Sequence, residues 1–543
     1  MKKNLLNIPL FVLLFAVSLC GCSNDDEPVA TTTDGTTLTV IARADGFAST
    51  DGTAQTGIPQ TRASESGYTT NFVKGDQIGV FAMKDGSVIA DCKNVPLTYN
   101  GAAWEGTVYK YTGATYFAYY PYTADMNDKT SVDDIVTAFN TTVTAATDQS
   151  TYAKYTACDL MTATAASPTS GKTLTFTFTH QMSLIEISLP EQKCKSTDGA
   201  DAYEYFTPAL GATFSLTQSN GGSTMSIQPC PMGNGIYRYI VPVGTSSVTV
   251  SGEFNTADSK TIEYSKSSLS LSAGSYKRLN VTYSGSNNAV VRALVVGDYY
   301  YSDGSICPGD ASYPPNEDCL GIVYWLGDIK SDNYGLLDTR FPNGTHGLVV
   351  SLWEMPDPDN AGGEPKMTWT YGGYEYVNDW LSGATWSGSH SRPEGFSSIQ
   401  ITDRMQGYAN TVALEEYNKY IENPNNNKNQ NLRVKPIKGL AAFQTAHPAP
   451  VSSSGWYWPS VCELKQVCWG QGVTSQSTSG KSMLNPQIGK VGGTTFVDDY
   501  YWSSTERSNY SLAAWYVDFY NGGVNNFGRK GSYTYRVRPL LAF

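Results

Sequence analysis

Histidine and concentrated positive charge are both scarce in this sequence. Its 543 residues include four histidines, and 37 Lys and Arg stand against 49 Asp and Glu, so the formal net charge is −12. Binding to phosphate backbones needs clustered Lys and Arg, and without such clusters we expect no nucleic-acid partner. A paired-histidine helix, a phosphate-cradling glycine loop and an elbow serine are also missing. We therefore expect neither an enzyme nor a cofactor.

Metal-binding patterns are equally sparse. The histidines, at 180, 346, 390 and 447, are scattered, and His180 ends an expected strand, where a structural role is the usual one. No loop has the alternating acidic and amide residues that hold calcium. Asp498, Asp499 and Asp518 could converge in the fold, but we expect no obligatory metal.

Long hydrophobic runs are absent as well. The apolar run at residues 8–19 follows Lys2 and Lys3 and is shorter than the roughly 20 residues of a spanning helix, so it predicts a secretory signal peptide. It ends in LCGC at 19–22, which resembles the lipobox of bacterial lipoproteins. That resemblance implies that Cys22 is acylated and anchors the protein in a Gram-negative outer membrane. An ordinary secretory signal with Cys22 incidental is the alternative. The acidic residues at 25–27 resemble a surface-exposure signal, although a solvated tether would look the same.

Cysteine is too thinly spread for a disulfide scaffold, with ten in the whole chain and two of these in the signal region. Cys462 and Cys468 lie on an expected helix, where six residues separate them by about 9 Å. That exceeds the limit of about 7 Å between the Cα atoms of a disulfide. Cys307 and Cys319 flank a proline-rich loop and could form a bridge, with two unpaired thiols as the alternative.

The most abundant residue types favour β structure. The chain has 37 tyrosines and 51 glycines, and it is rich in Thr and Ser, which indicates short strands joined by turns. Helical periodicity is confined to residues 410–421 and 460–468. The length predicts about three or four domains.

An ordered set of motifs marks the first half of the chain. It comprises TRA at 61–63, GDQIGVFA at 75–82, YFAYYPY at 116–122 and DLM at 159–161, followed by alternating strands at 174–180 and 184–189. This set resembles the fimbrillin family of lipoprotein pilins. The resemblance implies two tandem β-sandwich domains, which we expect at 36–160 and 161–284, after a signal peptide at 1–22 and an acidic tether at 23–35.

The same resemblance implies a route of assembly. The lipid carries the precursor to the cell surface, an arginine-specific protease cuts after the first strand, and a strand from a neighbouring pilin subunit fills the groove. By resemblance Arg62 is the first choice for the cut and Arg43 the second. In the alternative, Arg62 merely ends a strand in a lipoprotein that is never processed.

A Gly, Ser and Asn linker at 284–288 precedes a change of composition towards Trp, Asn and Gly. The series WPS at 458–460, YWSSTE at 501–506, AWYVDF at 514–519 and RVRP at 536–539 resembles the C-terminal domain of bacterial collagen-like adhesins, which is related to C-type-lectin folds. We therefore expect an α+β lectin-like domain at 290–543, closed by a strand at 535–543 that stays within its own domain.

A recognition surface is expected on the hairpin at 515–529. Strand alternation places Trp515, Val517 and Phe519 towards a core and the next residues outward. Rings beside carboxylate, amide and guanidinium groups suit sugars. The predicted ligand-binding residues are Tyr516, Asp518, Tyr520, Asn525, Asn526 and Arg529. A solvent-facing hairpin without a ligand is the alternative.

These inferences combine into one functional hypothesis, a fimbrial tip subunit that attaches the cell to a glycan or protein receptor. Its partners would be other pilin subunits and the receptor, and its membrane contact would be the lipid alone. The competing hypothesis is a surface lipoprotein that stays anchored and binds or processes glycans without joining a pilus.

Overall fold

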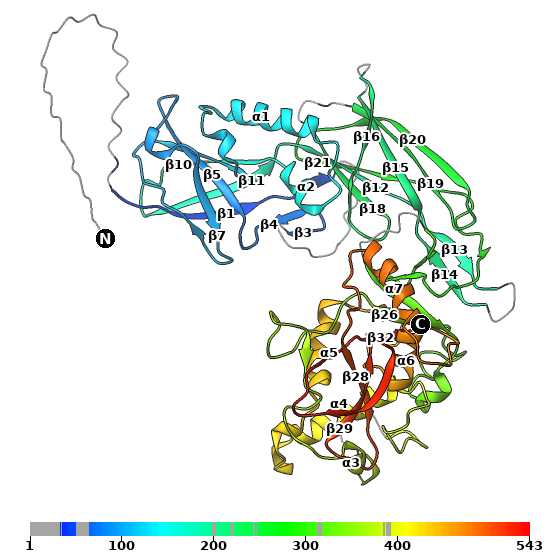
Figure 1. Cartoon of the computed structure of the whole chain (residues 1–543). Coiled ribbons are helices and arrows are strands. Elements are labelled where there is room, and N and C mark those ends of the chain that lie inside the picture. Colours follow the sequence, from blue (N-terminus) through cyan, green and yellow to red (C-terminus); the bar gives the residue numbers. More distant parts are fainter. Residues whose placement is uncertain are drawn as a thin grey trace, which may run out of the picture.

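The first β unit consists of one large curled sheet (Figure 1). The computed structural model describes residues 33, 35–49, 64–197, 202–218, 222–242, 245, 247–311, 318–383, 386 and 392–543. The sheet runs in the order β1 (Thr39–Ala44), β11 (Thr173–His180), β10 (Met161–Ala166), β9 (Thr115–Tyr120), β5 (Gln77–Lys84), β7 (Val95–Tyr99) and β8 (Trp104–Glu105), with β6 (Ser87–Val88) paired to β5. Since β10 and β11 complete this sheet, it extends past residue 160, where the sequence suggested a boundary.

Alternation along β9 explains why this sheet is buried on both faces. Tyr116, Ala118 and Tyr120 point into a core enclosed by the curled sheet. Phe117 and Tyr119 point the other way, into a second cluster shared with helices α1 (Val132–Ala145) and α2 (Tyr152–Ala157). That second cluster also contains residues of the next sheet, so the first two β units pack directly against each other.

The second β unit is a sandwich of two sheets. One sheet runs β17 (Cys230–Pro231), β18 (Ile236–Val241), β12 (Ser183–Ser188), β21 (Ser275–Asn280) and β2 (Ala48–Ser49). The other runs β16 (Thr224–Ile227), β15 (Leu210–Gln218), β19 (Ser247–Asn255) and β20 (Thr261–Ser270). Ile185 and Ile187 of β12 meet Leu216 of β15 and Val250 of β19 in the core between them.

A small sheet leads from the sandwich to the C-terminal unit. It contains β14 (Glu204–Thr207), β13 (Gln192–Lys195) and β22 (Val290–Val291). Cys194 and Tyr205 of this sheet are buried in the same cluster as Tyr300 and Phe543 of the C-terminal unit. The two units therefore share a core, although a linker separates them in the sequence.

The C-terminal unit combines two sheets with helices. The sheets run β24 (Ile306–Cys307), β23 (Tyr299–Tyr301), β25 (Cys319–Leu326), β26 (Gly347–Ser351) and β32 (Leu540–Ala542), and β27 (Lys366–Met367), β31 (Tyr535–Arg536), β28 (Tyr500–Glu506), β29 (Ala513–Asp518) and β30 (Gly523–Arg529). The helices are α3 (Val377–Gly383), α4 (Gly407–Glu422), α5 (Lys435–Ala446), α6 (Val461–Trp469) and α7 (Ser479–Lys490). Strands far outnumber helices in the described part of the chain, so the prediction of a mainly β protein is confirmed. None of the described helices is both long and apolar enough to cross a membrane.

Candidate functional site

Residues 37–49 form one extended segment that takes part in both β units. Its first strand, β1, pairs in parallel with β11 from Thr39 opposite Thr173 to Ala44 opposite Phe178. Its second, β2, pairs in parallel with β21. Leu38 and Val40 are buried in the core of the first unit, and Phe47 is buried where the two units meet. The segment thus supplies the edge strand of a sheet in each unit.

A hairpin of β3 (Ser64–Ser66) and β4 (Thr69–Asn71) closes over this segment. The Phe47 N–H donates to the carbonyl oxygen of Tyr68 at 2.9 Å, and a Cβ at Gly46 would overlap that oxygen. Tyr68 is fixed in turn, because its ring stacks on Tyr276 at 3.7 Å and its hydroxyl donates to Glu186 at 2.9 Å. The hairpin therefore fastens the segment to the second unit.

His180 lies beneath the segment. Its ring stacks on that of Phe47, with centroids 3.8 Å apart and planes 20° apart. The Nδ1 atom is 2.9 Å from Asp159 Oδ1, and Nε2 is 3.3 Å from Thr70 Oγ1. Both side chains of the His180–Asp159 pair are almost fully buried.

Of the residues expected to be acylated or cut, only Arg43 lies among the residues that the structure describes. Cys22 and Arg62 lie outside the described residues and stay predictions. Arg43 lies inside β1, where it pairs with Thr177 and its Nε donates to Thr177 Oγ1 at 3.0 Å. A peptide bond held in a paired strand is a poor protease substrate, because a protease needs locally accessible, unpaired chain.

The six expected ligand-binding residues do not converge on one point. Tyr516 lies directly opposite Asn525 in the β29–β30 pair, but Arg529 lies opposite Ala513. Asp518 and Ala513 are five residues apart on β29, about 17 Å along a strand. The buried Asp518 carboxylate accepts a hydrogen bond from the Tyr520 N–H at 2.9 Å, so it holds the turn. Tyr520 and Arg529 are exposed, and Asn525 and Asn526 are half-buried.

An aromatic cluster gathers on the same sheet instead. It contains Tyr500, Tyr516, Tyr533 and Tyr535, and neighbouring ring centroids lie 4.8 to 6.0 Å apart. Tyr500 is 41% exposed and Tyr533 is 46% exposed, whereas Tyr535 rests on the buried Trp502. Sequence reasoning found Tyr516 by alternation. It missed the other three, because long-range pairing decides which tyrosines meet: the pairing of β28 with β29 brings Tyr500 beside Tyr516, and the pairing of β28 with β31 brings Tyr535.

The three aspartates considered for calcium are used in other ways. Asp498 pairs with Lys481, and Asp499 lies 2.9 Å from both Lys366 and Arg536. Across the described part of the chain, no group of three or more His, Cys, Asp or Glu residues could hold a metal ion.

Of the two alternatives for Cys307 and Cys319, the structure has the two unpaired thiols and not the bridge. Both thiols are free and buried. Cys307 pairs with Tyr299 on one side of β23, and Cys319 pairs with Tyr301 on the other side. Two strand spacings amount to about 9.6 Å, which is beyond the reach of a disulfide.

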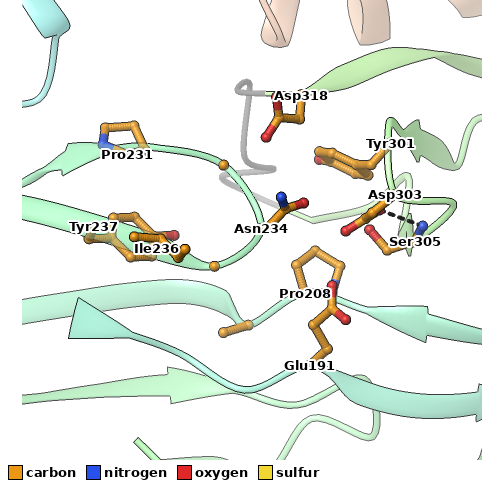
Figure 2. A pocket seen from close by; sticks show the side chains of 13 residues that line it. Glu191, Pro208, Pro231, Asn234, Ile236, Tyr237, Tyr301, Asp303, Ser305 and Asp318 are labelled. Atoms are coloured by element: carbon orange, nitrogen blue, oxygen red, sulfur yellow. Dashed lines mark hydrogen bonds between the residues drawn. The ribbon is translucent and has the colours of Figure 1, made fainter. Parts of the chain in front are cut away.

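A small cavity lies between the second β unit and the C-terminal unit (Figure 2). Three carboxyl groups line it, Glu191 from the β unit and Asp303 and Asp318 from the C-terminal unit, and the described residues that line it include no Lys, Arg or His. Burial, followed by the negative charge of Asp303, raises the pKa of Glu191 to about 7 and that of Asp318 to about 6. A Cβ at Gly233 would overlap the Asp318 carboxylate, so the two units approach closely here.

The strand at the C-terminal end of the sequence lies within its own unit. β32 pairs with β26, and Leu540 also exchanges two backbone hydrogen bonds with Tyr457, at 2.8 and 2.9 Å. Leu540, Leu541 and Ala542 are completely buried.

Comparison with known proteins places these units in context. Residues 61–297, which extend from the β3–β4 hairpin through both β units, match a family described as "Fimbrillin-like". Over 571 aligned positions, covering 98% of both chains, the sequence is 29% identical to a Bacteroides ovatus protein named "Putative fimbrium tip subunit Fim1C". A crystal structure of a fimbrial protein from Bacteroides ovatus is 26% identical, with 93% of this chain and 99% of that chain covered and a TM-score of 0.40.

Proposed function

We propose that this chain is a bacterial fimbrial subunit that stands at the tip of the fibre and attaches the cell to a glycan or protein receptor. The fimbrillin-like region and the near full-length relative named as a fimbrium tip subunit support this proposal. The observation that carries it is the segment 37–49, which is built into both β units and continues into the stretch that contains Arg62. Before processing, acylated Cys22 holds the precursor at the outer membrane.

Cleavage after Arg62 accounts best for the geometry of this segment. Such a cut separates all of residues 37–49 from the rest of the chain. A cut after Arg43 would leave Phe47 and β2 in place and still joined to the hairpin, and Arg43 is itself held in β1. Departure of the segment bares the edges of β11 and β21, and such open edges accept a strand from a neighbouring subunit.

The tip position is supported by the burial of β32. To serve as a donor strand, residues 540–543 would have to leave their sheet and expose several buried side chains. Each large apolar side chain withdrawn costs about 1.5–3 kcal/mol. A subunit that accepts a strand from a neighbour, but whose own β32 stays in its sheet, ends a fibre rather than extending it.

For the receptor surface, the best-supported location is the aromatic cluster of Tyr500, Tyr516, Tyr533 and Tyr535. Its outer rings are exposed, and its inner rings anchor them to the core. Exposed rings stack on the C–H faces of sugars, and tyrosine hydroxyls exchange hydrogen bonds with sugar hydroxyls. A glycan is therefore the favoured ligand.

Replacing both exposed rings tests this assignment. Each aromatic contact contributes about 0.5–1.5 kcal/mol, so the double variant Tyr500→Ala, Tyr533→Ala should bind a positive glycan or mucin surface about tenfold more weakly. Val451→Ala is the matched control, because Val451 is 91% exposed and lies outside the cluster. Wild-type binding by the double variant would exclude the aromatic cluster as the receptor surface.

A further inference from the structure

The Phe47 side chain lies in a slot over the ring of His180, and the shape of this slot suits an aromatic ring better than other side chains. The side chain is 5% exposed and belongs to a cluster that includes Met182 and Leu184 of the second unit and Phe117 of the first. The floor of the slot is the ring of His180, which lies nearly parallel to the Phe47 ring at 3.8 Å. A flat ring fits this space face to face.

The floor of the slot is held rigidly. Both ring nitrogens of His180 are engaged, Nδ1 with Asp159 and Nε2 with Thr70, so the imidazole cannot rotate to meet a ligand of another shape. Thr70 belongs to β4 of the hairpin that covers the segment. The slot is therefore assembled from the strand β11, the loop before β10 and the covering hairpin.

The backbone contacts of the segment carry little selectivity. The N–H groups of Phe47 and Ala48 donate to the carbonyl oxygens of Tyr68 and Gly274, at 2.9 and 2.8 Å. Any strand supplies such backbone donors, so main-chain pairing gives affinity, whereas side-chain pockets give specificity. In the first unit the segment buries two aliphatic side chains, Leu38 and Val40, whereas Ala42 and Ala44 are small, so no aromatic ring is required there.

We propose that the slot over His180 selects the partner strand, and that the strand which replaces residues 37–49 must place an aromatic ring where Phe47 now lies. This inference rests on the proposed replacement of the N-terminal segment. A strand with a small residue at this point leaves a cavity beside Phe117 and Met182, and it opens the buried His180–Asp159 pair to one side. An aliphatic residue fills part of the volume but loses the stacking on the imidazole.

Labelled peptides allow the slot to be tested without altering the protein. The full chain is cut after Arg62 with an arginine-specific protease, the cut is verified by mass, and the protease is inhibited. Fluorescent peptides with the sequence of residues 36–49 are then added, and their incorporation is followed by anisotropy and gel filtration. The variants are Phe47→Ala, Phe47→Leu and, as the matched control, Ile41→Ala, since Ile41 lies on the same segment but is 51% exposed.

We expect the Phe47→Ala peptide to be incorporated roughly tenfold more weakly than the native peptide. The Phe47→Leu peptide should be intermediate, and the Ile41→Ala peptide should be unchanged. Equal incorporation of the native and Phe47→Ala peptides would overturn the slot while leaving strand replacement intact. If the cut protein incorporates no peptide at all, strand replacement itself fails, and the selectivity inferred from it fails as well.

Discussion

The carboxyl groups of Glu191 and Asp318 show how single residues respond to the junction between two units. Both have raised pKa values because they are buried and lie near the negative charge of Asp303. An acid whose pKa is higher in the folded state than in the unfolded state makes the folded state more stable at low pH, where it is protonated, than at high pH, where it is ionised. The contribution of these two groups to the stability of the folded state is fully present below about pH 4. It declines as the pH rises through about 6 for Asp318 and about 7 for Glu191.

Glu191→Gln should therefore stabilise the junction at pH 8 and have little effect at pH 4, since the amide resembles the protonated acid. The measurement is the thermal unfolding temperature of the full chain across this range, where the variant should show a shallower decline. Glu263→Gln is the control, because Glu263 lies exposed on β20. A variant that loses stability at pH 8 would show that the charged form of Glu191 is favourable.

The N-terminal ends of α4 and α6 contact each other in the C-terminal unit. The buried Glu463 forms a capping box with Ser460 at the start of α6, and its carboxylate also accepts from the Gly407 N–H at 3.0 Å. Gly407 begins α4, and a Cβ there would overlap both the Glu463 carboxylate and the Ser460 backbone. The starts of two helices are thus locked together through one glycine.

Gly407→Ala should destabilise the C-terminal unit by about 1–3 kcal/mol, because the added methyl overpacks this contact. Gly489→Ala on α7 is a matched control, as its Cβ would meet open space, and it should be neutral or stabilising by about 0.5–1 kcal/mol. Chemical denaturation of the two variants compares them directly. Equal stability of both would mean that α4 and α6 can separate at little cost.

The sequence predicted those elements whose local signals agree with their environment. Residues 410–421 and 460–468 had a helical apolar period, and they are helical within α4 and α6. Helix α1 was missed because VDDIVTAFNTTVTA is rich in β-branched residues, and α7 was missed because Pro486 interrupts its pattern. The aromatic cluster could be predicted only in part, since long-range strand pairing decides which tyrosines meet.

At the scale of the whole molecule, the shared core joins the second β unit to the C-terminal unit. Tyr205 is buried among residues of both, and its hydroxyl donates to the carbonyl oxygen of Arg292 at 2.8 Å. Tyr203 stacks on His346 with centroids 4.3 Å apart. In the proposed tip subunit, force on a bound receptor would therefore pass to the fibre through packed side chains as well as through the linker.

Tyr205→Ala should destabilise the C-terminal unit even though Tyr205 precedes the linker. Truncating a buried aromatic ring costs about 3–5 kcal/mol, and hydrogen exchange should accelerate in β23 and β24, which pack on it. Phe206→Ala is the control, because Phe206 is the next residue and is 45% exposed. Faster exchange confined to the second β unit would indicate that the C-terminal unit does not depend on the shared core.

The N-terminus of the protein in fibres tests the central claim most directly, because release of residues 37–49 is the step on which the proposed assembly depends. Fimbriae sheared from cells that express this chain should be purified, and the mass and first residue of the incorporated protein determined. We expect this protein to begin at Ala63, without Cys22, its lipid or the segment 37–49. Protein that is always recovered with an acylated Cys22, and never begins after an arginine, would contradict the proposal that this chain joins a fibre by strand replacement.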